Sequence, residues 1–267
     1  MATKRRSRQS LMTQLVFITG ASSGIGWALA QAYAAKGCRL ALVVRDRCKL
    51  QALMQGARVP EDLVQIYEAD VTDEVGMRRV AAECLATQGL PDVVIANAGI
   101  SRGVMIERPE DWPVLEQTWR TNVLGVAHTL GPFVSLMRTR GSGRLVAISS
   151  VAGVRGLPGH AAYSSSKAAC TALCESLRAD LTHSGVRVTV ILPGYIDTPM
   201  TKKNPFPMPF LMDADGFAQR ALRAIDRGQA FAVIPRPMAL AVWLLKWLPA
   251  SWLDKALGKQ PRKPRDT

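Results

Sequence analysis

Short apolar runs alternate with stretches of helical periodicity along most of this 267-residue chain. The runs are rich in Val, Ile and Leu and continuously apolar, which is typical of parallel strands buried on both faces of a sheet. The stretches between them are long enough for the crossover helices that parallel strands require. We therefore predict an α/β fold with a doubly wound, Rossmann-type parallel sheet. The predicted strands are 15–19, 39–44, 63–70, 91–99, 143–149, 186–194 and 230–235.

The chain contains no linker-like stretch and no internal repeat, and its length suits one substantial core. We expect a single catalytic domain at 12–236, followed by an apolar or amphipathic helix at 237–258. The segments 1–11 and 259–267 are basic, and much of the net charge of +13 lies there. We expect both to be mobile tails, which either keep the protein in solution or attract anionic lipid or an acidic partner. Because aromatic and basic residues are not interleaved, we expect no nucleic-acid partner.

The five cysteines, at 38, 48, 84, 170 and 174, are odd in number and form no CxxC pair. This spacing argues against a disulfide framework or a zinc site, and we expect no metal. It favours a reducing, cytoplasmic location. Cys170 and Cys174 lie one helical turn apart, and we interpret them as packing residues.

Three glycines fall at the first strand-to-helix turn, in the sequence TGASSGIG at 19–26. Gly20, Gly24 and Gly26 permit a tight turn, and they let backbone N–H groups and the helix N-terminus approach a pyrophosphate. The spacing TGxxxGxG is wider than the common GxGxxG pattern. Its place after a strand and ahead of a helix nevertheless favours a dinucleotide site over a simple turn.

A hydroxyl, a phenol and an amine are expected to meet at the carboxyl end of the sheet. Tyr163 and Lys167 lie four residues apart in a helical stretch, so they share a face and the ammonium can lie close to the phenol. Ser150 follows the strand at 143–149, and strand ends are where α/β folds present their chemistry. These groups suit proton transfer to or from an oxygen, since a nearby cation favours a phenolate. Together with the glycine turn, they indicate a nicotinamide-dependent oxidoreductase.

Several motifs follow one another in a recognisable order: TGASSGIG, Asp70-Val71, NAG at 97–99, Asn122, Ser150, YSSSK at 163–167 and PGYIDT at 193–198. Over about residues 15–200, this order resembles that of the short-chain dehydrogenase/reductase family. The resemblance implies that Asp70 and Val71 contact the adenine and that Asn97 stabilises the sheet near the cofactor. It also implies that Thr198 and the backbone at Ile196 hold the carboxamide. The predicted cofactor-binding set is Gly20, Ser22, Ser23, Gly24, Ile25, Gly26, Arg45, Asp70, Val71, Asn97, Gly99, Tyr163, Lys167, Pro193, Gly194, Ile196 and Thr198.

The same resemblance implies the catalytic roles. Tyr163 would donate or accept the substrate proton, and Ser150 would orient the substrate oxygen. Lys167 would bind the nicotinamide ribose and promote ionisation of the phenol, while Asn122 would hold a water in a proton relay. The predicted catalytic set is Asn122, Ser150, Tyr163 and Lys167.

The residues after the second strand bear on the choice of nicotinamide. NAD-type sites carry an acidic residue at the end of this strand, where it grips the ribose hydroxyls. Here the position is Val44, followed by Arg45, whose guanidinium suits a 2′-phosphate, and Arg47 could assist. Asp46 stands one place too late for the acidic role. We therefore predict NADP(H) rather than NAD(H).

Residues beyond the shared motifs concern the substrate. The proline-rich stretch 205–212 carries Phe206, Met208, Phe210 and Met212, which fit either a lid over an apolar substrate or burial against the core. The stretch 237–258 replaces an Asp-Gly-Gly ending common in the family. It is tryptophan-rich, at 243, 247 and 252, and its uncharged core is too short to span a bilayer. It suits a helix that packs on the fold or on a partner subunit, or one that lies on an anionic membrane surface at the inner face. We expect a homodimer.

The sequence thus predicts an enzyme that interconverts a carbonyl and an alcohol on an apolar, lipid-, steroid- or long-chain-like substrate. The alternative within the same chemistry is a 3-oxoacyl-carrier-protein reductase, because a basic surface suits an acidic carrier. A non-catalytic NADP(H)-binding sensor is a third hypothesis. It is disfavoured because a non-catalytic descendant would be free to lose the predicted catalytic set, and all four of its residues are present.

Overall fold

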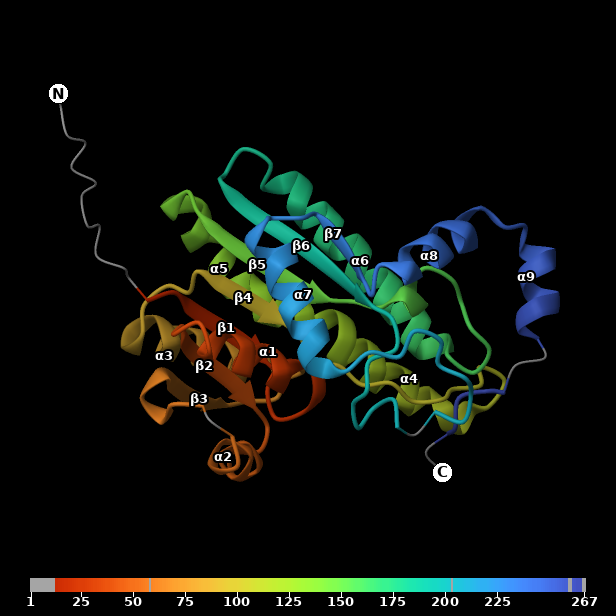
Figure 1. The fold of residues 1–267 in the computed structure, drawn as a ribbon, viewed down its shortest axis with the longest axis horizontal. Coiled ribbons are helices and arrows are strands. Elements are labelled where there is room, and N and C mark those ends of the chain that lie inside the picture. The colour runs from red at the N-terminus through yellow and green to blue at the C-terminus, as the bar shows by residue number, and fades with distance from the viewer. Residues whose placement is uncertain (1–12, 58, 203, 259–260, 266–267) are drawn as a thin grey trace.

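Seven parallel strands form one sheet in the part of the chain that this computed structural model describes, residues 13–57, 59–202, 204–258 and 261–265. The strand order is β3-β2-β1-β4-β5-β6-β7, and Figure 1 shows the strands side by side at the centre of the molecule. The predicted fold class is confirmed. The strands are β1 (Leu15–Thr19), β2 (Arg39–Val44), β3 (Val64–Glu68), β4 (Val93–Ala96), β5 (Gly143–Ile148), β6 (Val186–Pro193) and β7 (Phe231–Ile234).

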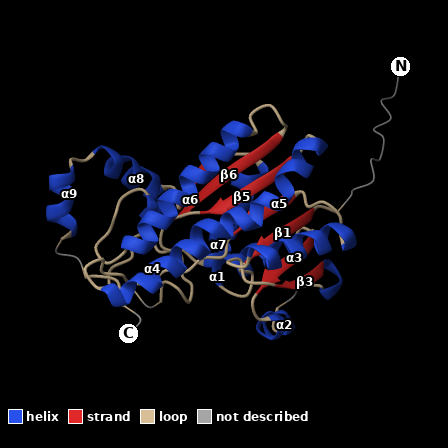
Figure 2. Cartoon of the chain, turned by 180° about the vertical axis from the view of Figure 1, so that it is seen from behind, coloured by secondary structure: helices blue, strands red, loops and turns tan. Residues whose placement is uncertain are grey.

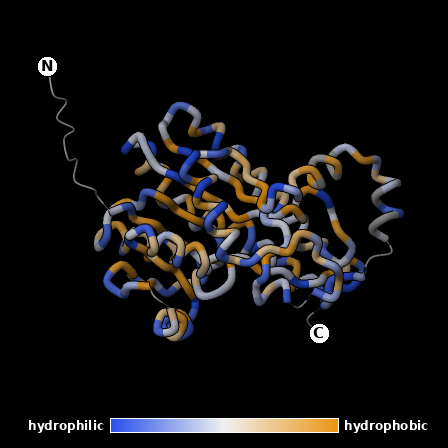
Figure 3. Tube along the Cα trace, viewed as in Figure 1, coloured by the Kyte–Doolittle hydropathy of each residue, from blue (hydrophilic) through white to orange (hydrophobic). Residues whose placement is uncertain are grey.

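Alternate side chains of each strand enter different halves of the core. In β1, Val16 and Ile18 pack with the helices at 24–34, 47–55 and 214–226, whereas Leu15 and Phe17 pack with those at 74–87, 125–140 and 161–180 on the opposite face. Figure 2 shows helices on both sides of the strands, and Figure 3 shows the apolar character of the central strands. The helices are α1 (Gly24–Ala34), α2 (Arg47–Gln55), α3 (Glu74–Thr87), α4 (Trp112–Trp119), α5 (Gly125–Arg140), α6 (Ala161–Asp180), α7 (Ala214–Asp226), α8 (Pro237–Trp247) and α9 (Ala250–Leu257).

The long helical region expected after β4 contains an irregularity. A π-helical turn, Arg120–Leu124, joins α4 to α5 and carries Asn122. Such turns change the direction of the residues that follow, and they are frequent at functional sites. The turn contains no proline or glycine from which the irregularity could be predicted.

The single helix predicted at 237–258 is wrong, because the chain forms α8 and α9 with a break between them. Leu248 is extended (ψ 136°), since the ring of Pro249 disfavours a helical conformation in the residue before it. Both helices lie beyond the end of the sheet (Figure 1). The side chains of Trp247 and Trp252 are 75% and 68% exposed. Among the described residues, no helix combines the length and the apolarity that crossing a membrane demands.

Of the two predicted basic tails, only part of the C-terminal one lies within the described residues. The segment 1–11 lies outside the described residues. Of 259–267, the described residues 261–265 return to the body of the protein, where Lys263 bonds to Ser101 and Arg265 pairs with Asp111. The expectation of a mobile tail therefore does not hold for this stretch, because its charges have partners.

Candidate active site

A cavity opens at the carboxyl ends of the strands, next to the point where the strand order reverses between β1 and β4. This is where open α/β sheets bind ligands. Every residue of the predicted cofactor-binding set lines the cavity, so the fold brings together positions that are as much as 178 residues apart in the sequence (Gly20 to Thr198). Val43, Ala69, Ile100, Thr121, Ser149, Met200 and Thr201 also line it, and the sequence motifs did not indicate them.

The glycine turn between β1 and α1 leaves no room for side chains. Gly20 has a φ of +69°, which favours glycine, and a Cβ on Gly26 would collide with the carbonyl oxygen of Gly20. A Cβ on Gly24 would lie 3.1 Å from the Cγ2 of Thr198. The turn therefore brings its backbone close to the segment that follows β6.

The N-terminus of α1 suits an anionic group. Its N-cap, Ser23, makes no side-chain capping hydrogen bond, and the first turn of the helix contains no acidic residue. The first N–H groups of a helix lack partners within the helix and carry partial positive charge. Because the turn is narrow and this end faces the cavity, the residues present fit the pyrophosphate of a dinucleotide.

Asn97 fastens the glycine turn to the neighbouring strand. Its Nδ2 donates to the carbonyl oxygens of Thr19 and Gly20, at 3.0 and 3.2 Å. The backbone N–H of Asn97 in turn donates to the Thr19 hydroxyl at 3.2 Å. These bonds hold β1 and β4 together where the cavity begins, in line with the stabilising role expected for Asn97.

At the far end of the cavity, charged residues have distinct tasks. Asp70 accepts two hydrogen bonds from Thr72, both 2.8 Å, and its other oxygen lies 3.8 Å from the Arg45 guanidinium. Asp46 accepts from the backbone N–H of Lys49 and so caps α2. Arg47 donates to the carbonyl of Ile66 at 2.7 Å and does not line the cavity, contrary to the assisting role expected for it. Of the three side chains at 45–47, only that of Arg45 lines the cavity.

Tyr163 and Lys167 share one face of α6, as their spacing predicts. The Lys167 Nζ lies 5.8 Å from the centre of the Tyr163 ring and donates to the carbonyl of Ile148 at 2.8 Å. Lys167 is buried, and this bond fixes its ammonium at the end of β5. An ammonium has three donors, so the remaining ones can serve a ribose hydroxyl.

Ser150 is held by the first turn after β5. It caps a short 3₁₀ turn, Val151–Gly153, by accepting a hydrogen bond from the Ala152 N–H at 3.1 Å. Because its oxygen accepts this bond, the hydroxyl proton can be donated to a substrate oxygen. Ser150 and Tyr163 line both this cavity and a second one beyond it.

Asn122 lies behind the cavity and is not one of its lining residues. Its side chain is fully buried; its oxygen accepts from the N–H of Ile100, and its amide donates to the carbonyl of Ile100 and to the Ser166 hydroxyl. A Cβ on Gly99 would lie 3.1 Å from Asn122 Oδ1 and 3.4 Å from Lys167 Nζ. Asn122 therefore lies near Lys167, with its side chain engaged in bonds to Ile100 and Ser166.

The second cavity shares Ser150 and Tyr163 with the first, and its lining combines apolar and aromatic side chains with a few polar ones. Phe206 lines it and contacts the rings of His160 and Tyr195, with centroids 5.9 and 6.3 Å apart. The stretch 205–212 thus behaves in both of the ways considered: Phe206 faces the cavity, whereas Met212 packs partly against the core. Phe210, in contrast, is 57% exposed.

Burial sets the charge of the histidine in this cavity. His160 is buried, and its Nδ1 donates to the carbonyl of Pro158 at 2.9 Å. Burial lowers the pKa of the imidazole below its ordinary value of 6.5, and the nearby Lys263 ammonium lowers it further. The ring is therefore neutral at pH 7.

Comparison with known proteins agrees with this geometry. The family model described as short chain dehydrogenase matches residues 14–206. The chain belongs to the short-chain dehydrogenase family. An uncharacterized oxidoreductase of Myxococcus xanthus is 40% identical over 240 residues, which cover 90% of this chain and 94% of that protein. A 3-oxoacyl-[acyl-carrier-protein] reductase of Thermotoga maritima is 32% identical over 194 residues, which cover 72% of this chain and 78% of that protein.

Solved structures of the family share the fold. A short-chain dehydrogenase from Streptomyces avermitilis superimposes with a TM-score of 0.76 at 26% identity, covering 92% of this chain and 95% of that one. An alcohol dehydrogenase from the archaeon Thermococcus sibiricus, solved with 5-hydroxy-NADP, gives a TM-score of 0.72 at 26% identity, covering 83% and 96%. The chain is therefore an oxidoreductase of a family whose members generally bind NAD(H) or NADP(H).

Some residues of this short-chain dehydrogenase became candidates only in the folded chain. Ser101, His160 and Lys263 line the second cavity, although no motif marks them. The position of Ser101 just after the NAG motif was an available signal. His160 and Lys263 reach the cavity through contacts between segments that are distant in the sequence, and local residue spacing does not predict such contacts.

Proposed function

We propose that this oxidoreductase uses NADP(H) to interconvert a ketone or aldehyde and an alcohol on an apolar substrate, with Tyr163 as the proton donor and acceptor. One observation carries the proposal. Ser150 and Tyr163 line both the dinucleotide cavity and the apolar cavity beyond it. A substrate in the second cavity would therefore present its carbonyl to these two hydroxyls.

In this proposal, the bound nicotinamide supplies or takes up the hydride, and the protein supplies orientation and the proton. Ser150, held by its bond from Ala152, donates to the substrate oxygen and positions it. Tyr163 gives its proton to that oxygen as the negative charge develops. Lys167, fixed by Ile148, favours the resulting phenolate and holds the ribose hydroxyls.

The residues at the end of β2 support NADP(H). Arg45 lines the cavity and is highly exposed, so its guanidinium can turn from Asp70 to a 2′-phosphate. The acidic residue closest to the ribose position in sequence, Asp46, is engaged as the cap of α2. Asp46 also does not line the cavity, so its carboxylate is not placed to grip the ribose hydroxyls.

The lining of the second cavity supports an apolar substrate. Val151, Leu157, Met200 and Phe206 are among the apolar residues that line it. The alternative, reduction of a 3-oxoacyl carrier protein, draws support from the Thermotoga maritima relative and from the net charge of +13, which would attract an acidic carrier.

The test is oxidation of NADPH by the full chain with a series of aldehydes and ketones of increasing length, a steroid ketone and a 3-oxoacyl thioester. We expect turnover to rise with apolar length. Turnover confined to the thioester would favour the alternative. Tight NADPH binding with no turnover on any of these compounds would favour the sensor hypothesis.

We further propose that α8 and α9 form a surface for an anionic membrane. Leu240, Leu244, Trp247 and Trp252 are all exposed on these helices, and exposed tryptophans suit the interface of a bilayer. Replacing both tryptophans with alanine should abolish sedimentation with anionic liposomes and leave NADPH binding unchanged. Equal sedimentation of the two proteins would contradict the proposal and favour contact with a partner subunit.

A further inference from the structure

The C-terminal segment 261–265 forms one wall of the second cavity. Pro261 and Lys263 line it together with Ser150 and Tyr163. This segment follows α9 in the chain and runs back toward the loop that follows β4, as the course of the ribbon in Figure 1 shows. Residues far from the family motifs thus complete the space where the substrate would bind.

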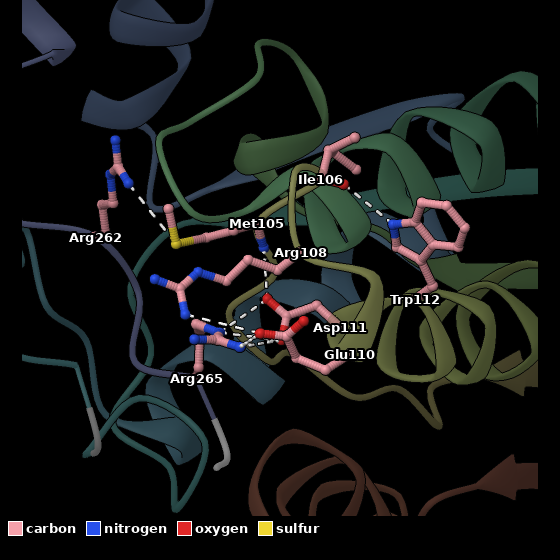
Figure 4. A network of polar contacts seen from close by, with 8 residues as sticks. All are labelled: Met105, Ile106, Arg108, Glu110, Asp111, Trp112, Arg262 and Arg265. Atoms are coloured by element: carbon pink, nitrogen blue, oxygen red, sulfur yellow. Dashed lines mark hydrogen bonds and ion pairs between the residues drawn. The ribbon is translucent and has the colours of Figure 1, made fainter.

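An ion pair fastens this segment to the loop before α4 (Figure 4). The Arg265 guanidinium makes a two-pronged contact with the Asp111 carboxylate, with Nε–Oδ2 and Nη2–Oδ1 distances of 2.8 and 2.7 Å. Asp111 is 5% exposed and also accepts from the N–H of Met105 at 2.8 Å. The Arg265 guanidinium keeps the pKa of Asp111 below its ordinary value, so the pair stays charged at neutral pH.

Two glycines make room for the segment. The N–H of Gly103 donates to the carbonyl of Pro264 at 3.0 Å, and a Cβ on Gly103 would collide with the backbone oxygens of Lys263 and Pro264. A Cβ on Gly159 would lie 2.9 Å from the backbone nitrogen of Lys263. The backbone of 263–264 therefore sits in a groove that is shaped for it.

The segment delivers an ammonium to the substrate side of the catalytic tyrosine. Lys263 Nζ lies 5.8 Å from the centre of the Tyr163 ring and donates to the Ser101 hydroxyl at 2.7 Å. Lys263 lines the cavity, and an ammonium has three donors, of which the bond to Ser101 uses one. A positive charge in this setting attracts an anionic group of a ligand more strongly than it would in water.

The geometry points to Lys263 as a substrate-specificity residue that selects carbonyl compounds bearing a carboxylate close to the reacting carbonyl. The apolar wall takes the rest of the chain of such an oxo acid, and the Arg265–Asp111 pair holds the lysine in place. This inference rests on the proposed carbonyl reductase function and narrows its substrate class.

The test compares pairs of substrates that differ in one group: straight-chain ketones, and oxo acids in which a carboxylate replaces the methyl group nearer the carbonyl. With NADPH saturating, the wild-type enzyme should prefer the oxo acid. Lys263→Gln should lower kcat/KM for the oxo acid roughly ten- to a hundredfold, the loss typical of a hydrogen bond to a charged group. It should leave the ketone nearly unaffected, and Lys263→Arg should restore part of the preference.

Three other variants separate charge from placement. Lys255→Gln removes an exposed ammonium on α9 and should change neither substrate. Arg265→Ala and Gly103→Ala keep Lys263 but release the segment, the first by removing the ion pair and the second by filling the groove. Both should reproduce the selective loss for the oxo acid.

Each result has a distinct meaning. An equal fall for both substrates in Lys263→Gln would overturn the inference, because the lysine would then act through Tyr163 or through the fold. An unchanged preference for the oxo acid would overturn it as well. Absence of turnover by the wild-type enzyme on every compound would instead overturn the proposed function, and the inference with it.

Discussion

The dinucleotide cavity is lined largely by residues of the shared sequence motifs, whereas the second cavity is completed by residues outside those motifs, in loops and in the C-terminal segment. In the first, Gly20, Gly26 and Asn97 act within one turn and its neighbouring strand. In the second, Arg265 reaches Asp111 across 154 residues of chain. In the proposed function, the first cavity binds a ligand common to the family, and its glycine turn offers backbone N–H groups to that ligand. The second must suit one substrate, and side chains from distant segments can vary without disturbing the first.

The largest loss of turnover should come from a change at Tyr163, which lines both cavities. Tyr163→Phe keeps the ring and removes the transferable proton, so we expect kcat to fall by roughly 100- to 10,000-fold while NADPH affinity is kept. Steady-state rates and a fluorescence titration with NADPH measure the two effects. Tyr33→Phe is the control: it removes a buried hydroxyl that has no hydrogen-bond partner in the part of the chain that the structure describes, and it should keep full turnover. Undiminished turnover in Tyr163→Phe would refute its role as the acid.

A smaller effect, on the preference for NADPH over NADH, is expected from a change at Arg45. Arg45→Asp should lower the NADPH-to-NADH preference roughly ten- to a hundredfold, because it removes a charged partner of the 2′-phosphate and adds a carboxylate that suits free ribose hydroxyls. Arg47→Asp is the matched control, since the Arg47 guanidinium bonds to Ile66 and does not line the cavity. If the two variants shifted the preference equally, general charge rather than the position of Arg45 would be responsible.

Substitution at Gly26 tests whether the glycine turn must be free of side chains to bind NADPH. Gly26→Ala places a Cβ against the carbonyl of Gly20, so we expect the Kd for NADPH to rise by about tenfold or more, as for the loss of more than 1 kcal/mol of binding. Gly131→Ala, in α5 with open space around it, should instead stabilise the fold by about 0.5–1 kcal/mol. Calorimetric titration and thermal unfolding measure the two. Unchanged NADPH binding in Gly26→Ala would contradict the close approach.

The smallest expected effect is on the free energy of unfolding, and it comes from His160 in the second cavity. Because its pKa is lowered in the folded protein, the unfolded chain binds the proton first as the pH falls below about 6.5. The free energy of unfolding should therefore decrease from pH 6.5 downward, until the folded protein also binds the proton. His160→Asn, which can still donate to Pro158, should flatten this part of the profile in urea unfolding. A profile identical to that of the wild type would show that the buried imidazole is not the cause.

The strands, and the residues that line the first cavity, could be predicted because their signals are local. Continuous apolar runs mark parallel strands, and the spacing of Tyr163 and Lys167 fixes a shared helix face. The break at Pro249 was also visible in the sequence, although the apolar residues on both sides favoured one helix. The π-helical turn at Asn122 was not, since its cause lies in the bonds to Ile100 and Ser166.

Lys263 could not be identified from the sequence for a different reason. In a basic stretch, a lysine with a tertiary contact and one facing solvent look alike. Only the groove at Gly103 and the pairing of Arg265 with Asp111 give Lys263 a fixed position. Both features depend on the folded loop between β4 and α4, which the sequence of the tail does not encode.

The ion pair between Arg265 and Asp111 also bears on the order of events during turnover. It anchors a segment whose described residues, 261–265, are exposed or half-buried, while the dinucleotide cavity rests on buried strands. Local opening costs least where few buried contacts must be broken. We expect amide hydrogens at 261–265 to exchange with solvent much faster than those of β1 or β4. In the proposed function, breaking the Arg265–Asp111 pair would open the wall of the second cavity while the nucleotide stays bound, and substrate would then enter and product leave by the C-terminal side.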